Sequence, residues 1–316
     1  MKFDIIGAGA IGLLFGGSLA ASGEDVVLWT RSEEQAAQLA AEGIQLEDDQ
    51  GNSIIIRPDK FKVYSVDCVA DTSVRKPDYL LIMTKQWHVD ERLLRTIGVL
   101  CGEGTSIVCF QNGVGHVDAF LAAAGGNPLY VAITTEGARR KNTRSVIRSK
   151  PGSTIIGVPG KTDQDIFDDQ SAENLMNKLL LAGFQALLSK DIDKEINRKL
   201  LINAVINPLT ALWRVPNGEL IATPERREVL RHLCSEAVEI FQACGMDIDD
   251  NIYDYVVSVC ESTSHNISSM LKDVLQGSPT EIESINGQLI KMAHQAGISA
   301  PGHEVVTKLI KGLLRR

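Results

Sequence analysis

Three polar side chains, one ammonium and two amides, recur every four residues in an otherwise apolar segment. Lys199, Asn203 and Asn207 share one face if residues 191–213 form a helix. A buried polar group must be hydrogen-bonded, so this stripe either faces water or contacts a polar molecule. An ammonium can protonate a developing alkoxide, and amides can orient a substrate without adding charge. The surrounding apolar residues favour a pocket wall over a solvated face.

The elements that must position such chemistry begin with a glycine-rich loop. Residues 2–6 have β-type composition, GAGAIG follows at 7–12, and an apolar helical segment comes next, which is the context in which GxGxxG binds a dinucleotide. Gly7 allows a tight turn, Gly9 lets a pyrophosphate approach, and Gly12 lets the helix pack on the strand. A βα turn without a ligand is the alternative. The predicted cofactor contacts of the loop and helix start are Gly7, Gly9, Ala10, Ile11 and Gly12.

The residue at the end of the second predicted strand discriminates between nicotinamide cofactors. NAD-selective sheets usually carry an acid there, which holds the ribose 2′-hydroxyl. This chain has Arg31 instead, and a guanidinium can pair with a 2′-phosphate in a fork geometry. The sequence therefore predicts NADP(H), with a merely solvated arginine as the alternative.

Strand and helix patterns go on alternating through the first half. A helix is predicted over 32–43 and a hairpin over 44–58. Further strands are predicted over 78–85, 105–113, 128–138 and, as antiparallel additions, 146–157. Ligands of open α/β sheets bind at the carboxyl ends of strands, although each polar residue there could equally be a cap or a turn. The polar strand ends are Lys85, Gln111, Asn112, Thr134, Thr135 and Glu136.

The β-type patterns stop near residue 191, and helical patterns follow. Pro208 lies inside the first predicted helix, where we expect a kink or a break. A turn at 216–220 and helices over 223–245, 252–277 and 280–297 come next. The predicted fold class is α/β: a Rossmann-type NADP-binding domain over 1–188, then an all-helical substrate and catalytic domain over 189–316. We expect the chemistry in the cleft between them.

Composition and charge narrow the partners. The 316 residues carry a formal net charge of -8, which argues against non-specific binding to nucleic acid or anionic membranes. The sequence contains no run of 18 apolar residues, so no membrane-spanning helix is predicted. Six cysteines without a CxxC pair suit a reducing cytoplasmic setting, and the clustered acids predict solvated loops rather than a metal site. The helical half could pair with a copy of itself, so monomer and homodimer stay open.

Together the motifs resemble the ketopantoate reductase family (2-dehydropantoate 2-reductases) over nearly the whole chain. In combination they are more specific than the glycine-rich loop alone. They are GAGAIG at 7–12, Lys85, QNGVG at 111–115, RKLLINAVINPLTAL at 198–212, PNGEL at 216–220, and SSML and TEIESINGQL within 268–289. The resemblance implies reduction of 2-dehydropantoate to (R)-pantoate by NADPH, on the route to pantothenate and coenzyme A.

The resemblance also implies a role for each matching residue. Lys199 looks like the family's catalytic lysine, and Asn203 and Asn207 look like asparagines that orient the lysine and the substrate. Ser269 resembles the residue that binds the substrate carboxylate, and Glu281 the glutamate that binds the substrate hydroxyl. The other implied contacts are Asn217 with the substrate, and Arg31, Lys85 and Asn112 with NADPH.

Two positions depart from the family's pattern. Many members have tryptophan two residues before the lysine, where this chain has Asn197, and a small residue or histidine where it has Glu136. An acid near the cofactor could alter substrate preference. Two alternatives therefore stay open: reduction of another 2-oxo or 3-hydroxy acid on the same scaffold, and an NADPH-binding regulator with a disabled site.

Overall fold

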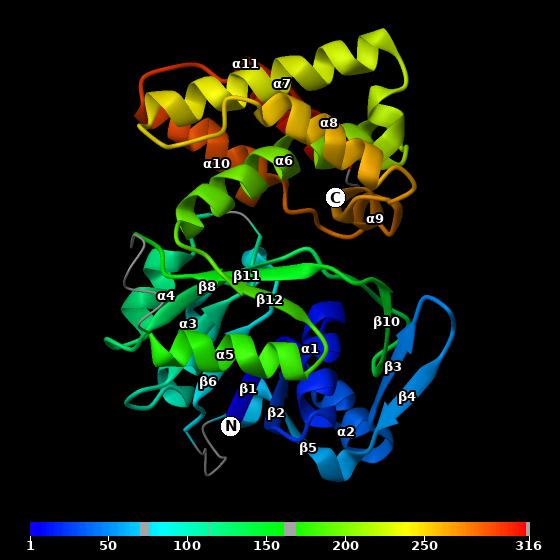
Figure 1. Ribbon diagram of the computed structural model, residues 1–316, viewed down its shortest axis with the longest axis vertical. Coiled ribbons are helices and arrows are strands. Elements are labelled where there is room, and N and C mark those ends of the chain that lie inside the picture. The colour runs from blue at the N-terminus through cyan, green and yellow to red at the C-terminus, as the bar shows by residue number, and fades with distance from the viewer. Residues whose placement is uncertain (70–75, 113, 161–168, 314–316) are drawn as a thin grey trace. The chain divides into compact units, whose positions relative to one another are not determined.

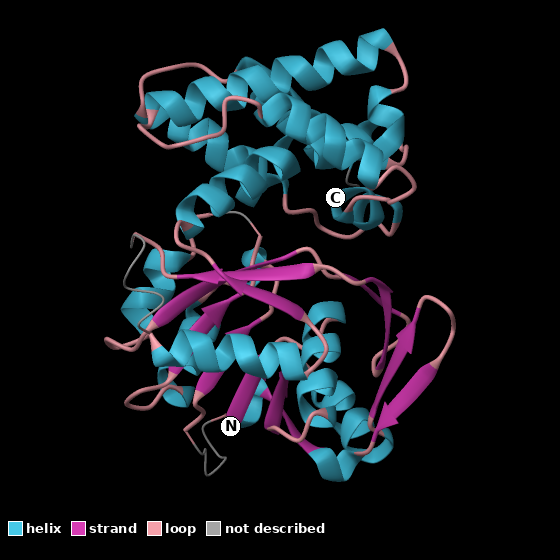
Figure 2. Ribbon diagram, in the orientation of Figure 1, coloured by secondary structure: helices cyan, strands magenta, loops and turns pink. Residues whose placement is uncertain are grey.

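The computed structural model describes residues 1–69, 76–112, 114–160 and 169–313. Contacts within this described part divide the chain into two compact units. Unit 1 comprises Met1–Gln111 and His116–Ile192, and unit 2 comprises Asn112–Gly115 and Asp193–Arg316. Unit 1 mixes strands with helices, whereas unit 2 is helical (Figure 1, Figure 2). The predicted fold class is confirmed, and the domain boundaries 1–188 and 189–316 stay a prediction.

Unit 1 is built on a sheet that has eight strands in the described residues, in the order β12-β11-β8-β7-β6-β1-β2-β5. Neighbouring strands pair in parallel except β8 and β11. The strands are β1 Lys2–Ile6, β2 Asp25–Thr30, β5 Phe61–Ser65, β6 Tyr79–Ile82, β7 Ser106–Cys109, β8 Leu129–Thr134, β11 Ser153–Gly157 and β12 Gln185–Leu188. The helices of unit 1 are α1 Ala10–Ala21, α2 Glu33–Glu42, α3 Glu91–Leu100, α4 Val117–Ala123 and α5 Gln170–Leu181, with short helices η1 Pro58–Lys60, η2 Val66–Cys68 and η3 Gln86–His88.

A smaller sheet, with four strands in the described part of the chain, has the order β4-β3-β10-β9. Its strands are β3 Ile44–Asp48, β4 Ser53–Ile56, β9 Gly137–Arg140 and β10 Ser145–Lys150. The β3–β4 hairpin confirms the prediction for 44–58. The prediction for 146–157 is half right: β10 is antiparallel to β9 but parallel to β3, and β11 is antiparallel to β8 but parallel to β12. Each of these strands has a second neighbour from a distant segment, which a local pattern does not reveal.

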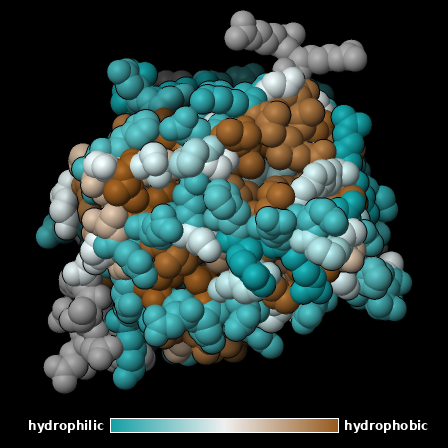
Figure 3. Space-filling model, turned by 90° about the horizontal axis from the view of Figure 1, so that it is seen from above, coloured by the Kyte–Doolittle hydropathy of each residue, from teal (hydrophilic) through white to brown (hydrophobic). Residues whose placement is uncertain are grey.

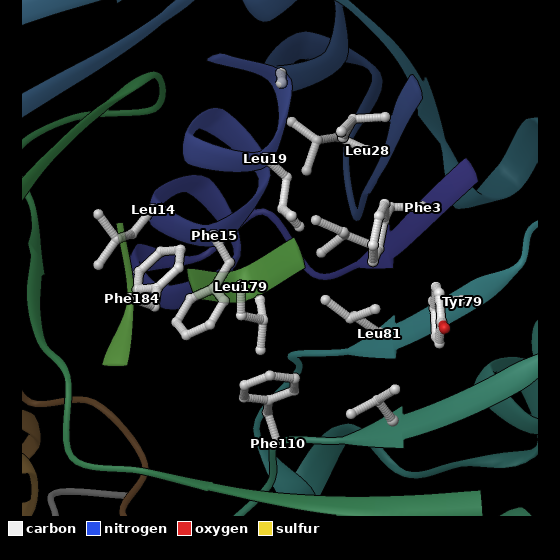
Figure 4. Packing of buried hydrophobic residues seen from close by; sticks show 14 of the residues in the cluster. Phe3, Leu14, Phe15, Leu19, Leu28, Tyr79, Leu81, Phe110, Leu179 and Phe184 are labelled. Atoms are coloured by element: carbon white, nitrogen blue, oxygen red, sulfur yellow. The ribbon is translucent and has the colours of Figure 1, made fainter. Parts of the chain in front are cut away.

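Aromatic side chains pack helix α1 against the large sheet (Figure 4). Phe15 stacks on Phe184 with ring centroids 4.0 Å apart and meets Phe110 edge-on at 5.1 Å. Phe3 on β1 stacks on Tyr79 of β6 at 5.1 Å. Such pairs add about 0.5–1.5 kcal/mol beyond the burial of their area. The core therefore fixes α1, and with it the glycine-rich loop that precedes this helix.

Unit 2 packs its helices around a second apolar core, to which α6, α7, α8 and α10 contribute Leu201, Leu233, Val256 and Leu289. Its helices are α6 Ile192–Trp213, η4 Asn217–Ile221, α7 Pro224–Ala243, α8 Ile252–Ser262, α9 Ser269–Leu275, α10 Ile282–Gln295 and α11 Pro301–Leu313. α11 was not predicted from the sequence.

Two predictions for unit 2 need correction. Helix α6 is one continuous helix that contains Pro208, so of the two expected outcomes the break is not formed, and the kink stays a prediction. The single helix predicted over 252–277 is divided into α8 and α9. Thr263 donates its hydroxyl back to the carbonyl of Val259, and Ser268 caps α9 by accepting from the Leu271 N–H. Hydroxyl side chains compete with helical hydrogen bonds in this way, which explains the interruption.

Helix α11 leaves an apolar stripe at the surface of unit 2. Val305 and Leu309, four residues apart, are 54% and 51% exposed. The face drawn in Figure 3 also shows apolar patches among hydrophilic side chains. The homodimer that the sequence left open stays a prediction.

Candidate cofactor and catalytic sites

The glycine-rich loop turns sharply between β1 and α1. Gly7 has a φ of 107°, which glycine adopts without strain, and its N–H donates to the Trp29 carbonyl at 3.0 Å. A Cβ at Gly12 would lie 1.9 Å from the Gly7 carbonyl oxygen, so a side chain does not fit there. A Cβ at Gly9 would meet no described atom within 4 Å. Gly9 therefore borders open space, as the approach of a pyrophosphate requires.

Helix α1 starts at Ala10, directly behind this open space. Its N-cap is Gly9, and no side chain of the described residues caps it. The first N–H groups of a helix, here those of Ala10, Ile11 and Gly12, have no acceptor within the helix. Together with the helix dipole they favour an anion. The residues present thus fit the phosphates of a dinucleotide.

Basic side chains gather where β2 and β6 end. Arg31 follows β2 and is exposed, and Lys85 follows β6 and is half-buried. The pKa of His88 is lowered by burial and by the positive charges of Arg31 and Lys85. Because the charges of Arg31 and Lys85 both act on His88, the two predicted cofactor residues lie in the same part of unit 1.

Hydrogen bonds fix the turn that carries Arg31. The Thr30 hydroxyl donates to the Ser32 carbonyl at 2.8 Å, and the Ser32 hydroxyl accepts from the N–H of Gln35 at 3.3 Å. Ser32 is the N-cap of α2, as the helix predicted over 32–43 requires. The turn leaves the guanidinium at the surface, where an incoming phosphate can reach it.

The structure brings three predicted site residues together within unit 2. Burial lowers the pKa of Lys199 to about 8, and the nearby carboxylate of Glu281 opposes this shift. Glu281 is 7% exposed and immediately precedes α10. Its Oε2 accepts from Nδ2 of Asn112 at 3.3 Å. An ammonium with a pKa near 8 can give up a proton at moderate pH, as a general acid must.

The two stripe asparagines occupy α6 as predicted. Asn203 is half-buried, and Asn207 is 7% exposed. The carbonyl of Asn207 accepts from the buried hydroxyl of Thr210 at 2.9 Å. The helical spacing is confirmed, and the contact of both amides with a substrate stays a prediction.

Asn217 and Ser269 flank the connection between α8 and α9. The buried side chain of Asn217 donates from Nδ2 to the Thr263 hydroxyl at 2.9 Å. Its Oδ1 is buried and has no partner among the described residues, so it can accept from a ligand. Ser269 is exposed at the start of α9, whereas Ser268 is buried and lies 2.7 Å from the Thr210 hydroxyl. The roles assigned to both residues stay predictions.

The two departures from the family's pattern are buried. Glu136 is 7% exposed, and both its carboxylate oxygens accept from Arg148, at 2.9 and 2.6 Å. The Arg148 guanidinium also lies over the ring of Phe184, 5.1 Å from its centroid. This acid is thus neutralised by an ion pair inside unit 1. Asn197, on α6, is 5% exposed.

Sequence reasoning missed several residues that support these sites. Gln35 completes an S-x-x-Q pattern that begins at Ser32, a capping-box signature that was available in the sequence. Thr210, Ser268 and Asn286 lie in apolar or polar runs where no spacing distinguishes them from ordinary helix residues. Their hydrogen bonds join distant segments, which only the fold reveals.

Two negative findings concern the described residues. None of their helices is long and apolar enough to cross a membrane. In the same residues, His, Cys, Asp and Glu side chains form no group of three or more that could hold a metal ion.

A Rossmann-type sheet with a glycine-rich βα turn, followed by a helical unit in which a buried glutamate lies near a half-buried lysine, defines a dinucleotide-dependent oxidoreductase. The family model for "Ketopantoate reductase PanE/ApbA" matches residues 3–161, and the one for "Ketopantoate reductase PanE/ApbA C terminal" matches residues 191–314. The chain belongs to the ketopantoate reductase family.

Individual proteins agree with this assignment. The chain is 33% identical over 317 residues to 2-dehydropantoate 2-reductase of Bacillus subtilis (strain 168), covering 100% of this chain and 98% of that protein. It is 31% identical to the enzyme of the same name from Salmonella typhi, covering 98% and 94%. A solved structure of D-mandelate dehydrogenase with NADH and anilino(oxo)acetate has a TM-score of 0.85 and 25% identity, covering 99% and 98%.

Proposed function

We propose that this protein reduces 2-dehydropantoate to (R)-pantoate with NADPH, in the cytoplasmic synthesis of pantothenate and coenzyme A. The observation that carries the proposal is the half-buried Lys199, whose pKa is about 8 and whose charge is balanced by the buried Glu281. The names of the full-length relatives support the substrate. The partner is thus a small 2-oxo acid rather than a nucleic acid or a membrane.

Lys199 acts as the general acid. When bound, NADPH supplies a hydride to the carbonyl carbon of the substrate. The Lys199 ammonium donates a hydrogen bond to the carbonyl oxygen and then its proton, so that an alcohol forms and a neutral amine remains. The amine regains a proton from water before the next turnover. Because its pKa lies near 8, this proton transfer is easier than from a fully solvated lysine.

The neighbouring polar groups orient the substrate. Glu281 accepts a hydrogen bond from the substrate's hydroxyl, and Asn112 holds the Glu281 carboxylate in place. Asn203 and Asn207 orient the lysine and the carbonyl, while Asn217 offers its Oδ1, which has no hydrogen-bond partner among the described residues. The hydroxyl of Ser269 donates to the substrate carboxylate. Fixing a reactant in this way lowers the entropic part of the barrier.

The cofactor preference follows from the charge at the end of β2. Arg31 is exposed there, and Lys85 lies close enough for both to lower the pKa of His88. This positive region suits the 2′-phosphate of NADPH, and the residue that follows β2 is Arg31 rather than the acid that would hold a ribose 2′-hydroxyl. We expect kcat/KM to be at least tenfold higher with NADPH than with NADH, and a preference for NADH would contradict this part of the proposal.

NADPH oxidation by the purified protein tests the whole proposal. Absorbance at 340 nm is followed with 2-dehydropantoate, 2-oxoisovalerate and pyruvate, for the wild type and for Lys199→Ala. We expect a strong preference for 2-dehydropantoate that Lys199→Ala abolishes. Binding of NADPH without turnover of any acid would favour a regulatory protein instead.

A second candidate is the reduction of another 2-oxo acid. It is favoured by the likeness to D-mandelate dehydrogenase, whose solved structure contains an aryl-substituted oxo acid, anilino(oxo)acetate. Adding 2-oxo-2-phenylacetate to the same assay distinguishes the two. If this acid is reduced and 2-dehydropantoate is not, the proposed role of Lys199 stands and the proposed substrate is wrong.

A further inference from the structure

One glutamine side chain ties the glycine-rich loop to a segment far away in the sequence. Gln35 lies in the first turn of α2 and is 8% exposed. Its Nε2 donates to the carbonyl of Ala8 at 2.9 Å and to the carbonyl of Thr143 at 2.7 Å. An amide nitrogen carries two N–H donors, so both are used.

The first acceptor belongs to the loop that would receive the pyrophosphate. Ala8 lies between Gly7, with its φ of 107°, and Gly9, which borders open space. The loop is therefore held on one side by the bond from Gly7 to the Trp29 carbonyl and on another by Gln35. Glycines make such a loop easy to deform, so external bonds decide how well it is preorganised.

The second acceptor belongs to the turn between β9 and β10, at residues 141–144. Oδ1 of Asn142 accepts from the N–H groups of Arg144 and Ser145, which shapes this turn. The turn is bound to α2 at two further points. The Thr143 hydroxyl bonds to the Gln38 side chain, and Arg144 pairs with Glu42.

The backbone of Gln35 completes the connection. Its N–H donates to the Ser32 hydroxyl, in the turn that carries Arg31. A single residue thus joins the phosphate-binding loop, the Arg31 turn and the 141–144 turn. Gln35 makes all three connections through hydrogen bonds, and it is almost fully buried.

We propose that Gln35 is a positioning residue for the dinucleotide, and that the 141–144 turn belongs to the cofactor site through it. By holding the Ala8 carbonyl, Gln35 keeps the loop in the conformation that accepts a pyrophosphate. The inference rests on the dinucleotide binding of the proposed function but not on the identity of the oxo acid. A preformed loop lowers the cost of binding.

The test compares isosteric variants. Gln35→Met keeps the volume and removes both donors, and we expect about a tenfold rise in the Kd and KM for NADPH. Gln35→Glu sets a carboxylate against two carbonyl oxygens, and we expect a larger rise. The kcat at saturating NADPH and the KM for the oxo acid should change less than about twofold, because the reacting groups are untouched.

Gln38→Met is the matched control. It removes a contact with the same turn but none with the loop, and we expect NADPH binding within about twofold of wild type. Binding is measured by titrating NADPH fluorescence, and thermal unfolding without cofactor shows that each variant is folded. If Gln35→Met does not fold, Gln35→Asn keeps the amide but is too short to span both carbonyls, and it should bind NADPH more weakly than wild type.

The outcomes separate this inference from the proposed function. If the wild type binds neither NADPH nor NADH, the proposed function fails. If the wild type binds NADPH and folded Gln35→Met binds it equally well, only the role of Gln35 is overturned. A parallel loss of kcat and of cofactor affinity in Gln35→Met would also overturn it, since that pattern indicates general damage.

Discussion

Asn112 and Glu281 are 169 residues apart in the sequence, yet Nδ2 of Asn112 donates to Oε2 of Glu281 at 3.3 Å. Asn112 follows β7 in the chain, but its contacts belong to the helical unit. The carboxylate it holds is the one that raises the pKa of Lys199 against burial. Asn112, in the segment that follows β7, therefore holds the carboxylate that opposes the effect of burial on Lys199.

The first prediction concerns the pH dependence of turnover. If Lys199 is the proton donor, kcat falls as pH rises through its pKa of about 8, because the neutral amine cannot donate to the alkoxide. Lys199→Ala should lower kcat by about 10²–10⁴-fold while leaving NADPH binding intact. The control is Lys194→Ala, a lysine on the same helix that pairs with Asp247 and Asp249 at the surface. A basic limb that persists in Lys199→Ala would remove the lysine from this role.

The second prediction uses the partner carboxylate. Glu281 raises the pKa of Lys199, so Glu281→Gln should lower that pKa and move the basic limb of the kcat profile to lower pH. The same variant should also weaken the binding of 2-dehydropantoate, because the hydroxyl of this substrate loses its hydrogen-bond acceptor. The binding of an oxo acid without a hydroxyl should be weakened less. The pH profiles of kcat and KM, measured at saturating NADPH with both acids, test the pKa shift and the loss of substrate binding. If the basic limb of the kcat profile does not move in Glu281→Gln, Lys199 and Glu281 do not interact during turnover.

Local patterns in the sequence predicted those features that depend on local structure. The spacing of Lys199, Asn203 and Asn207 predicts one helix face, and α6 provides it. GAGAIG predicts a tight βα turn, and Gly7 and Gly12 show the steric reasons. These features were predictable because backbone geometry and neighbouring residues alone produce them.

Features that depend on distant neighbours were not predictable. Nothing near Ser268 indicates that its hydroxyl meets that of Thr210, and nothing near Gln35 indicates Thr143. Glu136 was singled out because it departs from the family's pattern, and no spacing in the sequence reveals Arg148 as its partner. A kink or a break was expected at Pro208 from propensity, but no break forms, because packing of the apolar core around α6 outweighs the cost of one proline.

The third prediction contrasts two glycines of the same loop. A methyl group at Gly9 points into open space, so Gly9→Ala should fold with an unchanged Tm but bind NADPH at least tenfold more weakly. A methyl group at Gly12 would collide with the Gly7 backbone, so Gly12→Ala should lower the Tm even without cofactor. Thermal unfolding with and without NADPH measures both effects. Equal Tm losses in the two variants would contradict the assignment of the open side to the pyrophosphate.

The fourth prediction concerns acid stability. His303 is fully buried, Asn286 lies 3.0 Å from its Nδ1, and burial lowers its pKa from 6.5 to about 4, although Glu236 opposes the shift. Because the folded pKa is below the unfolded value, the unfolded state binds more protons between these pH values. The contribution of His303 to stability is therefore fully present above about pH 6.5 and falls by up to about 3 kcal/mol as pH drops towards 4.

Denaturant unfolding between pH 7 and 4.5 measures this slope. His303→Gln should start from a lower stability at pH 7 and show a shallower loss, because it removes the titrating group. The control is His265→Gln, since His265 is exposed and should leave the slope as in wild type. An identical slope in His303→Gln would assign the acid sensitivity to other groups, of which the buried His116 is the next to test.

The last prediction follows from the end of α6. Arg214 is the non-glycine residue with a positive φ, 56°, within the described chain, and it directly follows the last residue of α6. The N–H of Val215 donates to the carbonyl of Thr210 at 3.2 Å, the pattern of a helix end that prefers glycine. Arg214→Gly should raise the free energy of unfolding by about 0.5–1 kcal/mol, because glycine takes this backbone conformation without a Cβ clash. Arg214→Ala keeps the Cβ and should give no such gain, so equal denaturant midpoints for the two variants would show that the side chain, and not the backbone, determines the stability at this helix end.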